Sequence, residues 1–199
     1  MSLYAAMQEV INADSTDTSI QEMYVDSPKR LMLSTVPALL QDTHIGEQGV
    51  QLIEYFEGCR LTSYQDSKGI WTIGLGHTGN IKPRQTITHA QAVKFFADDI
   101  TWAENFIKNH ITRSLLQNQF DALVSFTFNV GVGNFLHSSV LTNINAGRFD
   151  LIPHSLCLWN QSGGHVITGL VTRRHAEAVL FSFNKLEFSP VHTPDDWQA

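Results

Sequence analysis

The sequence predicts a predominantly helical α+β fold, in which one short β-hairpin precedes a larger helical part. Apolar residues recur at helical spacing over much of residues 44–188. Only residues 62–77 change to the two-residue period of β-strands. Residues 117–130 are apolar on nearly every side, which is typical of a helix that passes through the centre of a lobe. A single hairpin among several helices favours the α+β class.

The helix before the hairpin is expected to end at Gly58. Val50, Ile53 and Glu57 are separated by three and then four residues, so they share one face of that helix. Glycine is common just past the end of a helix. This interpretation places Glu57 in the last turn, beside the start of the hairpin.

The hairpin is expected to close with a three-residue loop at residues 67–69. Gly69 fits the left-handed position that such a loop requires. Residue 66 then pairs with residue 70, and residue 64 with residue 72. Asp66 and Thr72 should therefore project from the same face of the hairpin.

The rest of the chain is expected to be helical. Thr88 and Gln91 have the spacing of a capping box, which predicts a helix start. Further helices are expected at residues 117–130, 136–146, 149–160 and 172–184.

Charge divides the chain into three parts. Residues 1–43 carry six acidic and two basic side chains, and residues 189–199 carry two acidic ones. Residues 44–188 carry eleven of each sign and are neutral. We therefore expect an acidic N-terminal extension (1–43), one catalytic domain (44–188) and a C-terminal tail (189–199). The neutral domain argues against nucleic-acid binding, which needs a basic surface.

The extension at residues 1–43 is the least regular part of the sequence. We expect a helix near residues 3–11, but too few apolar side chains for a separate core. We expect the extension to pack on the domain, away from its functional site. Its main apolar contacts would come from Leu31, Met32, Leu33, Leu39 and Leu40. In the alternative, it crosses the site and its acidic groups keep the protein inactive.

The two cysteines and the apolar stretch at residues 31–40 bear on cellular location. Cys59 and Cys157 are too few for a disulfide framework, so two separate buried thiols are expected. The apolar stretch is broken by polar residues and a proline, and it lies far from Met1. It predicts neither a membrane span nor a signal peptide, and hence a protein made in the cytoplasm.

Glu57 and Asp66 are a candidate pair for cleaving a glycosidic bond. This chemistry needs a protonated carboxyl beside the leaving oxygen and a second carboxylate across the sugar. Glu57 lies in line with Ile53 and next to Phe56, so burial should favour its neutral form. Asp66 lies at an exposed turn, where it and Thr72 could hold a water. Taken alone, a Glu at a helix end and an Asp in a turn are more often ordinary surface residues.

The residues around this pair resemble the phage lysozymes, the twenty-fourth family of glycoside hydrolases. The resemblance is carried by Phe56-Glu57-Gly58, by Tyr64-Gln65-Asp66 and by the run from Gly69 to Thr78. The family signature is a Glu, eight residues, an Asp, five residues and a Thr, which Glu57, Asp66 and Thr72 reproduce. Further similar segments follow in the same order, so the resemblance covers residues 44–188.

This resemblance implies a two-lobed lysozyme-like fold and a muramidase activity. The family hydrolyses the β-1,4 bond between N-acetylmuramic acid and N-acetylglucosamine in bacterial peptidoglycan, without a metal or cofactor. By analogy, Glu57 would donate the proton, and Asp66 with Thr72 would position the attacking water. The anomeric carbon would be inverted.

The resemblance also assigns residues around the catalytic pair. His77 would form a structural pair with Asp99 on the following helix, which should lower the pKa of Asp99. Three residues would line the substrate cleft: Phe128, Asn129 and Ser138. Arg173 and Arg174 would either bind the anionic peptide stem or pair with acids on a helix surface. The tryptophans at positions 71, 102 and 159 are interpreted first as packing residues and second as saccharide platforms.

Three biological settings are compatible with the sequence. The first is a monomeric endolysin of a phage or prophage, which waits in the cytosol until a holin opens the membrane and then acts in the periplasm. The second is a muramidase delivered by a virion or secretion apparatus, with residues 1–43 as a docking element and with an immunity partner. The third is a lysozyme-like module that binds the wall without cutting it. The intact set of Glu57, Asp66 and Thr72 argues against the third.

Overall fold

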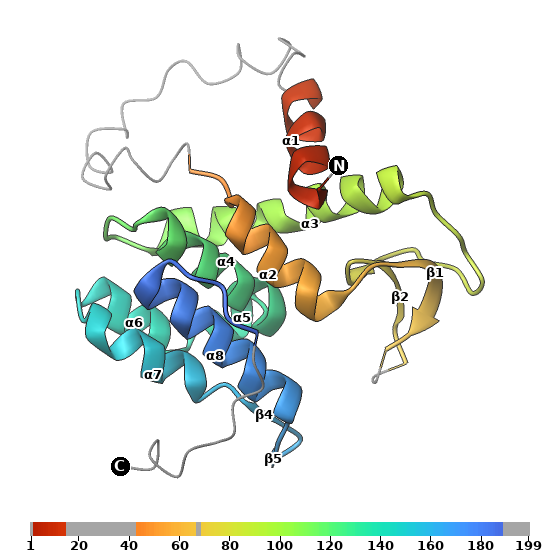
Figure 1. The fold of residues 1–199 in the computed structure, drawn as a ribbon. Helices are drawn as coiled ribbons and strands as arrows, with labels where there is room; N and C mark the ends of the chain where they lie inside the picture. The colour runs from red at the N-terminus through yellow and green to blue at the C-terminus, as the bar shows by residue number, and fades with distance from the viewer. Residues whose placement is uncertain (1, 15–42, 67–68, 189–199) are drawn as a thin grey trace, which may run out of the picture.

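The computed structural model describes residues 2–14, 43–66 and 69–188. Its elements are α1 (Leu3–Asp14), α2 (Glu47–Glu57), β1 (Arg60–Gln65), β2 (Trp71–Gly74), β3 (His77–Thr78), α3 (His89–His110), α4 (Gln117–Val130), α5 (Val132–Leu136), α6 (Ser139–Asn145), a 3-10 turn (Phe149–Leu151), α7 (Ile152–Cys157), β4 (Gln161–Ser162), β5 (His165–Val166) and α8 (Thr168–Phe183). The strands β1 to β3 form a small lobe on one side, and α4 to α8 form a larger helical lobe on the other (Figure 1). The predicted two-lobed, mainly helical α+β fold is confirmed.

The hairpin has the predicted register. β1 and β2 are antiparallel, with Tyr64 opposite Thr72 and Gln65 opposite Trp71. The backbone N–H of Asp66 donates to the carbonyl of Ile70 at 3.0 Å, which closes the turn. Gly69 has a φ of 78°, the left-handed conformation that glycine adopts without strain. Local turn chemistry is therefore sufficient to fix this end of the small lobe.

The helical lobe is built around α4, as its apolar sequence predicts. Phe120, Leu123 and Phe126 of α4 are fully buried, and α2, α3 and α8 all pack against this helix. The predicted capping box is also present at the start of α3, where the Thr88 side chain accepts the N–H of Gln91. The expected helix at 149–160 is shorter, because a 3-10 turn precedes α7 and α7 ends at Cys157. A small exposed hairpin, β4–β5, follows it and was not expected.

The start of α2 is held by acidic side chains from other helices. Helix amino ends leave backbone N–H groups without partners, and Gly46 has no side chain to supply one. Asp121 of α4 accepts the N–H of Gly46 at 2.8 Å, and Glu104 of α3 accepts the N–H of Ile45 at 2.7 Å. Burial raises the pKa of Asp121, while the bond from Gly46 opposes this rise. These contacts fix α2, whose other end carries Glu57.

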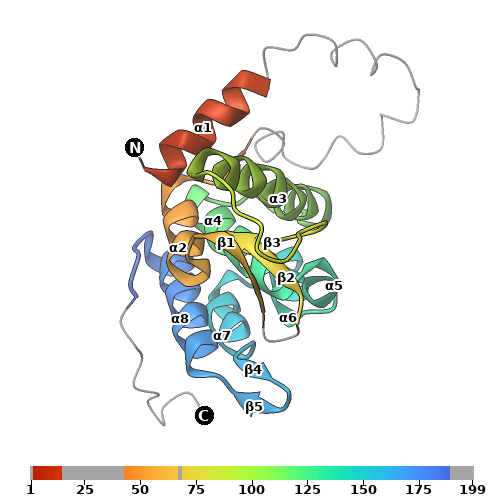
Figure 2. The same cartoon turned by 90° about the vertical axis from the view of Figure 1, so that its right-hand side faces the viewer.

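The helix expected near the N-terminus is present as α1, and it joins the main core. Its first turns lie against α2 and α3, whereas its far end projects away from the molecule (Figures 1 and 2). Leu3 is 5% exposed and Met7 is fully buried in the same core as α2 to α8. The residues expected to make this contact, Leu31, Met32, Leu33, Leu39 and Leu40, lie outside the described residues. Part of the expected extension therefore packs as an integral layer of the domain.

The cysteines and the lengths of the helices bear on two further expectations. Both cysteines are free, but Cys59 is exposed and Cys157 is half-buried, so the expectation of two buried thiols is wrong for Cys59. No helix in the described ranges combines the length and apolar character needed to cross a bilayer.

Candidate active site

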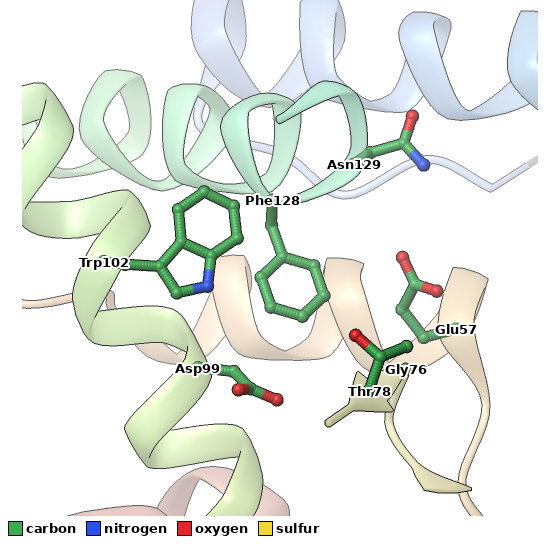
Figure 3. A pocket seen from close by; sticks show the side chains of 7 residues that line it. All are labelled: Glu57, Gly76, Thr78, Asp99, Trp102, Phe128 and Asn129. Atoms are coloured by element: carbon green, nitrogen blue, oxygen red, sulfur yellow. The ribbon is translucent and has the colours of Figure 1, made fainter. Parts of the chain in front are cut away.

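A cavity of about 270 Å³ lies between the small lobe and the helical lobe. Its lining comes from α2, α3, α4 and the segment around β3 (Figure 3). The lining residues are Glu57, Gly76, Thr78, Asp99, Trp102, Phe128 and Asn129. The structure thus brings together five of the residues singled out in the sequence: Glu57, Asp99, Trp102, Phe128 and Asn129.

Glu57 owes its position to the end of α2. It is the last residue of the helix, and the N–H of Gly58 bonds back to the carbonyl of Glu54 at 2.9 Å. Beside the carboxylate, Gly76 has a φ of 89°, and a Cβ there would lie 3.5 Å from Oε2 of Glu57. That distance is an ordinary van der Waals contact, so glycine is favoured at position 76 by the left-handed backbone and not by lack of space.

Arg173 of α8 binds the Glu57 carboxylate from the helical lobe. Its Nη1 lies 2.6 Å from Oε1 of Glu57. The Arg173 side chain is 4% exposed, and its guanidinium also lies 5.5 Å from the ring centroid of Phe56. Glu57 is therefore less buried than expected, because its side chain is 23% exposed and its carboxylate is paired with a cation. Arg173 occupies Oε1 and leaves Oε2 on the side of Gly76.

This ion pair is the outer end of a buried row of alternating charges. Glu177 is fully buried, and its Oε1 accepts bonds from Arg173 at 3.3 Å, Arg174 at 3.0 Å and Ser125 at 2.8 Å. Burial lowers the pKa of Arg174 to about 10, and the negative charge of Glu177 opposes this shift. The row Glu57–Arg173–Glu177–Arg174 balances its own charge, which a buried set of ions requires. Arg173 and Arg174 are thus buried, not surface residues.

Arg174, at the other end of this row, also contacts a residue that lines the cavity. Nη2 of Arg174 donates to Oδ1 of Asn129 at 2.9 Å, which orients the Asn129 amide from behind. Nε of Arg174 and Oε2 of Glu177 are 2.9 Å apart but are not aligned as a hydrogen bond. The same charged row therefore positions both Glu57 and Asn129.

The predicted pair of His77 and Asp99 is present. Nδ1 of His77 lies 2.8 Å from Oδ2 of Asp99, and the imidazole stacks on Phe95 with centroids 4.4 Å apart. Burial raises the pKa of Asp99, and the hydrogen bond and charge of His77 only partly oppose the rise. The expectation of a lowered pKa is therefore wrong, because desolvation outweighs the partner. Asp99 thus both pairs with His77 and lines the cavity.

Asp66 and Thr72 lie together on the hairpin but do not line this cavity. Oδ1 of Asp66 accepts the N–H of Ile70 at 2.8 Å, and the Thr72 hydroxyl donates to the carbonyl of Ile70 at 3.1 Å. Since both side chains bind the backbone of one residue, they are neighbours, as the register predicts. Thr72 is 4% exposed.

Ser138 has a structural role that the resemblance did not indicate. Its hydroxyl accepts the N–H of Leu141 at 3.2 Å, which caps α6, and donates to the carbonyl of Phe135 at 2.7 Å. It is 2% exposed and absent from the cavity lining. The structure thus gives a helix cap in place of the expected cleft residue.

Sequence reasoning missed the role of Arg173 and interpreted Trp102 as a packing residue first and a saccharide platform second. The spacing of Arg173, Arg174 and Glu177 on a helix held the signal for the role of Arg173, since residues three and four apart are neighbours. That pattern cannot tell a buried set of ions from a surface one. Among the described residues, no group of three or more His, Cys, Asp or Glu side chains could hold a metal ion.

The fold and the cavity define a two-lobed, lysozyme-like protein. The phage lysozyme family model matches residues 54–177. The chain therefore belongs to the phage lysozyme family.

Individual relatives agree with this membership. An endolysin of Bacillus phage PZA is 43% identical over 141 residues, which are 69% of this chain and 55% of the relative, so this chain spans about half of that protein. An endolysin of Acyrthosiphon pisum secondary endosymbiont phage 1 is 37% identical over 69% of this chain and 97% of its own length. Among solved structures, the muramidase domain of SpmX from Asticaccaulis excentricus is 36% identical, with a TM-score of 0.66 over 70% of this chain and 97% of that one.

Proposed function

We propose that this protein is a peptidoglycan muramidase that hydrolyses the β-1,4 bond between N-acetylmuramic acid and N-acetylglucosamine. The observation that carries the proposal is the position of Glu57, whose carboxylate faces a cavity between two lobes and is fixed by Arg173. The names of the relatives, endolysin and muramidase, support the same activity.

In this mechanism, Glu57 is the acid and Asp66 is the base. Since Arg173 binds Oε1, Oε2 is the atom that donates a proton to the glycosidic oxygen as its bond to the anomeric carbon breaks. A water held by Asp66 and Thr72 attacks that carbon, and Asp66 accepts the proton that the water loses. Attack from the face opposite the leaving group inverts the anomeric carbon, so the β-linked substrate yields an α product.

The setting that we propose is a phage or prophage endolysin. The protein would be made in the cytoplasm and would reach periplasmic peptidoglycan once a holin has opened the inner membrane. A monomer is sufficient for this role, because every side chain invoked comes from one chain. Holin genes beside the coding sequence would support this setting, whereas a secretion cluster with an immunity gene would contradict it.

Glu57→Gln tests the activity directly. The variant keeps the shape of the side chain but cannot donate a proton, so cleavage should fall below a few per cent of wild type. Glu47→Gln makes the same chemical change at the exposed, opposite end of α2 and is the matched control. Turbidity loss of permeabilised Gram-negative cells measures the rate, and a thermal melt confirms folding. A folded Glu57→Gln variant with substantial activity would contradict the assignment.

A further inference from the structure

We propose that Trp102 forms a sugar-stacking subsite and helps to determine substrate binding. This inference rests on the muramidase function proposed above and concerns the same cavity. Trp102 lies on α3 one turn after Asp99, so both side chains emerge from one face of that helix. It lines the cavity on the side away from Glu57 (Figure 3).

The indole is exposed in a way that packing alone does not explain. It is 39% exposed, although tryptophan is normally well buried. One face stacks on Phe128, with ring centroids 5.9 Å apart and planes 12° apart. Trp159 provides the contrast, since it packs edge-on against the core residue Phe126 at 81° and does not line the cavity. Trp102 therefore presents apolar surface to the cavity on a rigid aromatic support.

The groups around Trp102 define the chemistry of the ligand. The Asp99 carboxylate, 24% exposed, can accept hydrogen bonds at one end of the cavity. The Asn129 amide, oriented by Arg174, and the Thr78 hydroxyl can both donate and accept. A flat apolar surface beside a few fixed polar groups is typical of sites for small amphipathic ligands. An N-acetylhexosamine ring has one apolar face and a rim of hydroxyl and amide groups, and it fits this combination.

The position of Trp102 predicts which kinetic constant it controls. The indole lies across the cavity from the proton donor, so it contacts a sugar ring beside the bond that breaks and not the reacting atoms (Figure 3). Such a contact is equally strong in the ground state and the transition state. It should therefore lower KM and leave kcat almost unchanged.

The test uses Trp102→Ala, Trp102→Phe and the matched control Trp159→Phe, with soluble glycan strands from peptidoglycan as substrate. We expect Trp102→Ala to raise KM roughly tenfold, which corresponds to about 1.4 kcal/mol of lost binding. Trp102→Phe should raise KM less, because a smaller ring remains. Trp159→Phe should leave KM unchanged, and kcat should stay within about twofold of wild type in all three variants. Melting temperatures show whether each variant is folded.

Binding without cleavage gives a second readout. In the Glu57→Gln background, the glycan strands should change the tryptophan fluorescence, and the added Trp102→Phe substitution should abolish most of that change. An unchanged KM and an unchanged fluorescence response in the Trp102 variants would overturn the subsite and leave the muramidase activity intact. A wild-type protein that cleaves no peptidoglycan would overturn both proposals.

Discussion

The two carboxylates of the proposed mechanism are held in opposite ways. Glu57 is fixed from behind by a row of ions that lies on about one turn of α8 and ends on Asn129 of α4. Asp66 is fixed by its own turn, through the N–H of Ile70 four residues later. Position 57 therefore depends on the packing of several helices, whereas position 66 depends on local backbone chemistry. Substitutions in the row of ions behind Glu57 should lower both the stability and the activity. Substitutions on the hairpin should lower mainly the activity.

The largest expected effect comes from Glu177→Gln, which breaks the buried row. The variant leaves Arg174 without its carboxylate partner, while Arg173 keeps its ion pair with Glu57. An uncompensated buried charge typically costs about 3–5 kcal/mol. Urea denaturation at neutral pH measures the loss, and activity should fall because Arg173 loses the charged contact that holds it from behind. Glu187→Gln removes a carboxylate from an exposed pair with Lys185 and should cost under about 1 kcal/mol. Equal free energies of unfolding for the two variants would show that the buried row stabilises the protein no more than the exposed pair does.

Met7→Ala tests whether a loss of stability in the helical part always lowers the activity. Met7 is fully buried, and removing such a side chain costs at least about 2 kcal/mol. We expect a value near this lower limit, because Met7 lies on a terminal helix that packs mainly on α2 and α3. Activity per folded molecule should stay at the wild-type level, since no residue of α1 lines the cavity. Glu9→Ala, at an exposed position of the same helix, is the control. A marked gain in activity would instead favour an inhibitory role for the N-terminal residues.

Thr72→Val tests the hairpin side of the comparison. The variant keeps the branched shape but loses the hydroxyl that donates to Ile70, which should cost about 1 kcal/mol. Cleavage should fall far more than this stability change explains, because the hydroxyl is proposed to hold the attacking water. Thr72→Ser should recover most of the rate. If the valine variant cleaves at the wild-type rate, the hydroxyl does not hold the water.

The smallest effect concerns Asp99, at the contact between β3 and α3. Burial raises its pKa above the usual value of 3.8, so the folded state binds this proton more tightly than the unfolded chain does. The contribution of Asp99 to stability is therefore full below the unfolded pKa and is lost as pH rises through the folded pKa. As pH rises from below 3.8 through the folded pKa, the free energy of unfolding of wild type should decline relative to Asp99→Asn. A rise in the free energy of unfolding of wild type relative to the variant would show that His77, not burial, determines the direction of the Asp99 pKa shift.

Patterns of local origin could be read from the sequence. The register of the hairpin follows from its loop length and Gly69, and the start of α3 follows from Thr88 and Gln91. The pairing of His77 with Asp99 was also predicted, from the family resemblance. Each of these features needs only short segments of chain or a motif that the family shares.

Features that depend on burial were predicted poorly. The surroundings of Glu57, the direction of the Asp99 pKa shift and the exposure of Cys59 all differ from expectation. In each case the residue type and spacing were known, but the depth of the side chain and its partners from other elements were not. Ser138 is a similar case, because a serine suits a helix cap and a ligand site equally well.

The sequence by itself determined the mixed helical and hairpin composition, the hairpin register and the spacing of Glu57, Asp66 and Thr72. These are set by periodicity, turn chemistry and chain order, which act over a few residues. Only the tertiary structure decided that Arg173 binds Glu57, that α1 completes the core and that Trp102 faces the cavity. Ion pairing and burial join residues more than 100 positions apart, as in the contact of Glu57 with Arg173. Such contacts depend on how the helices pack, and no local pattern encodes that packing.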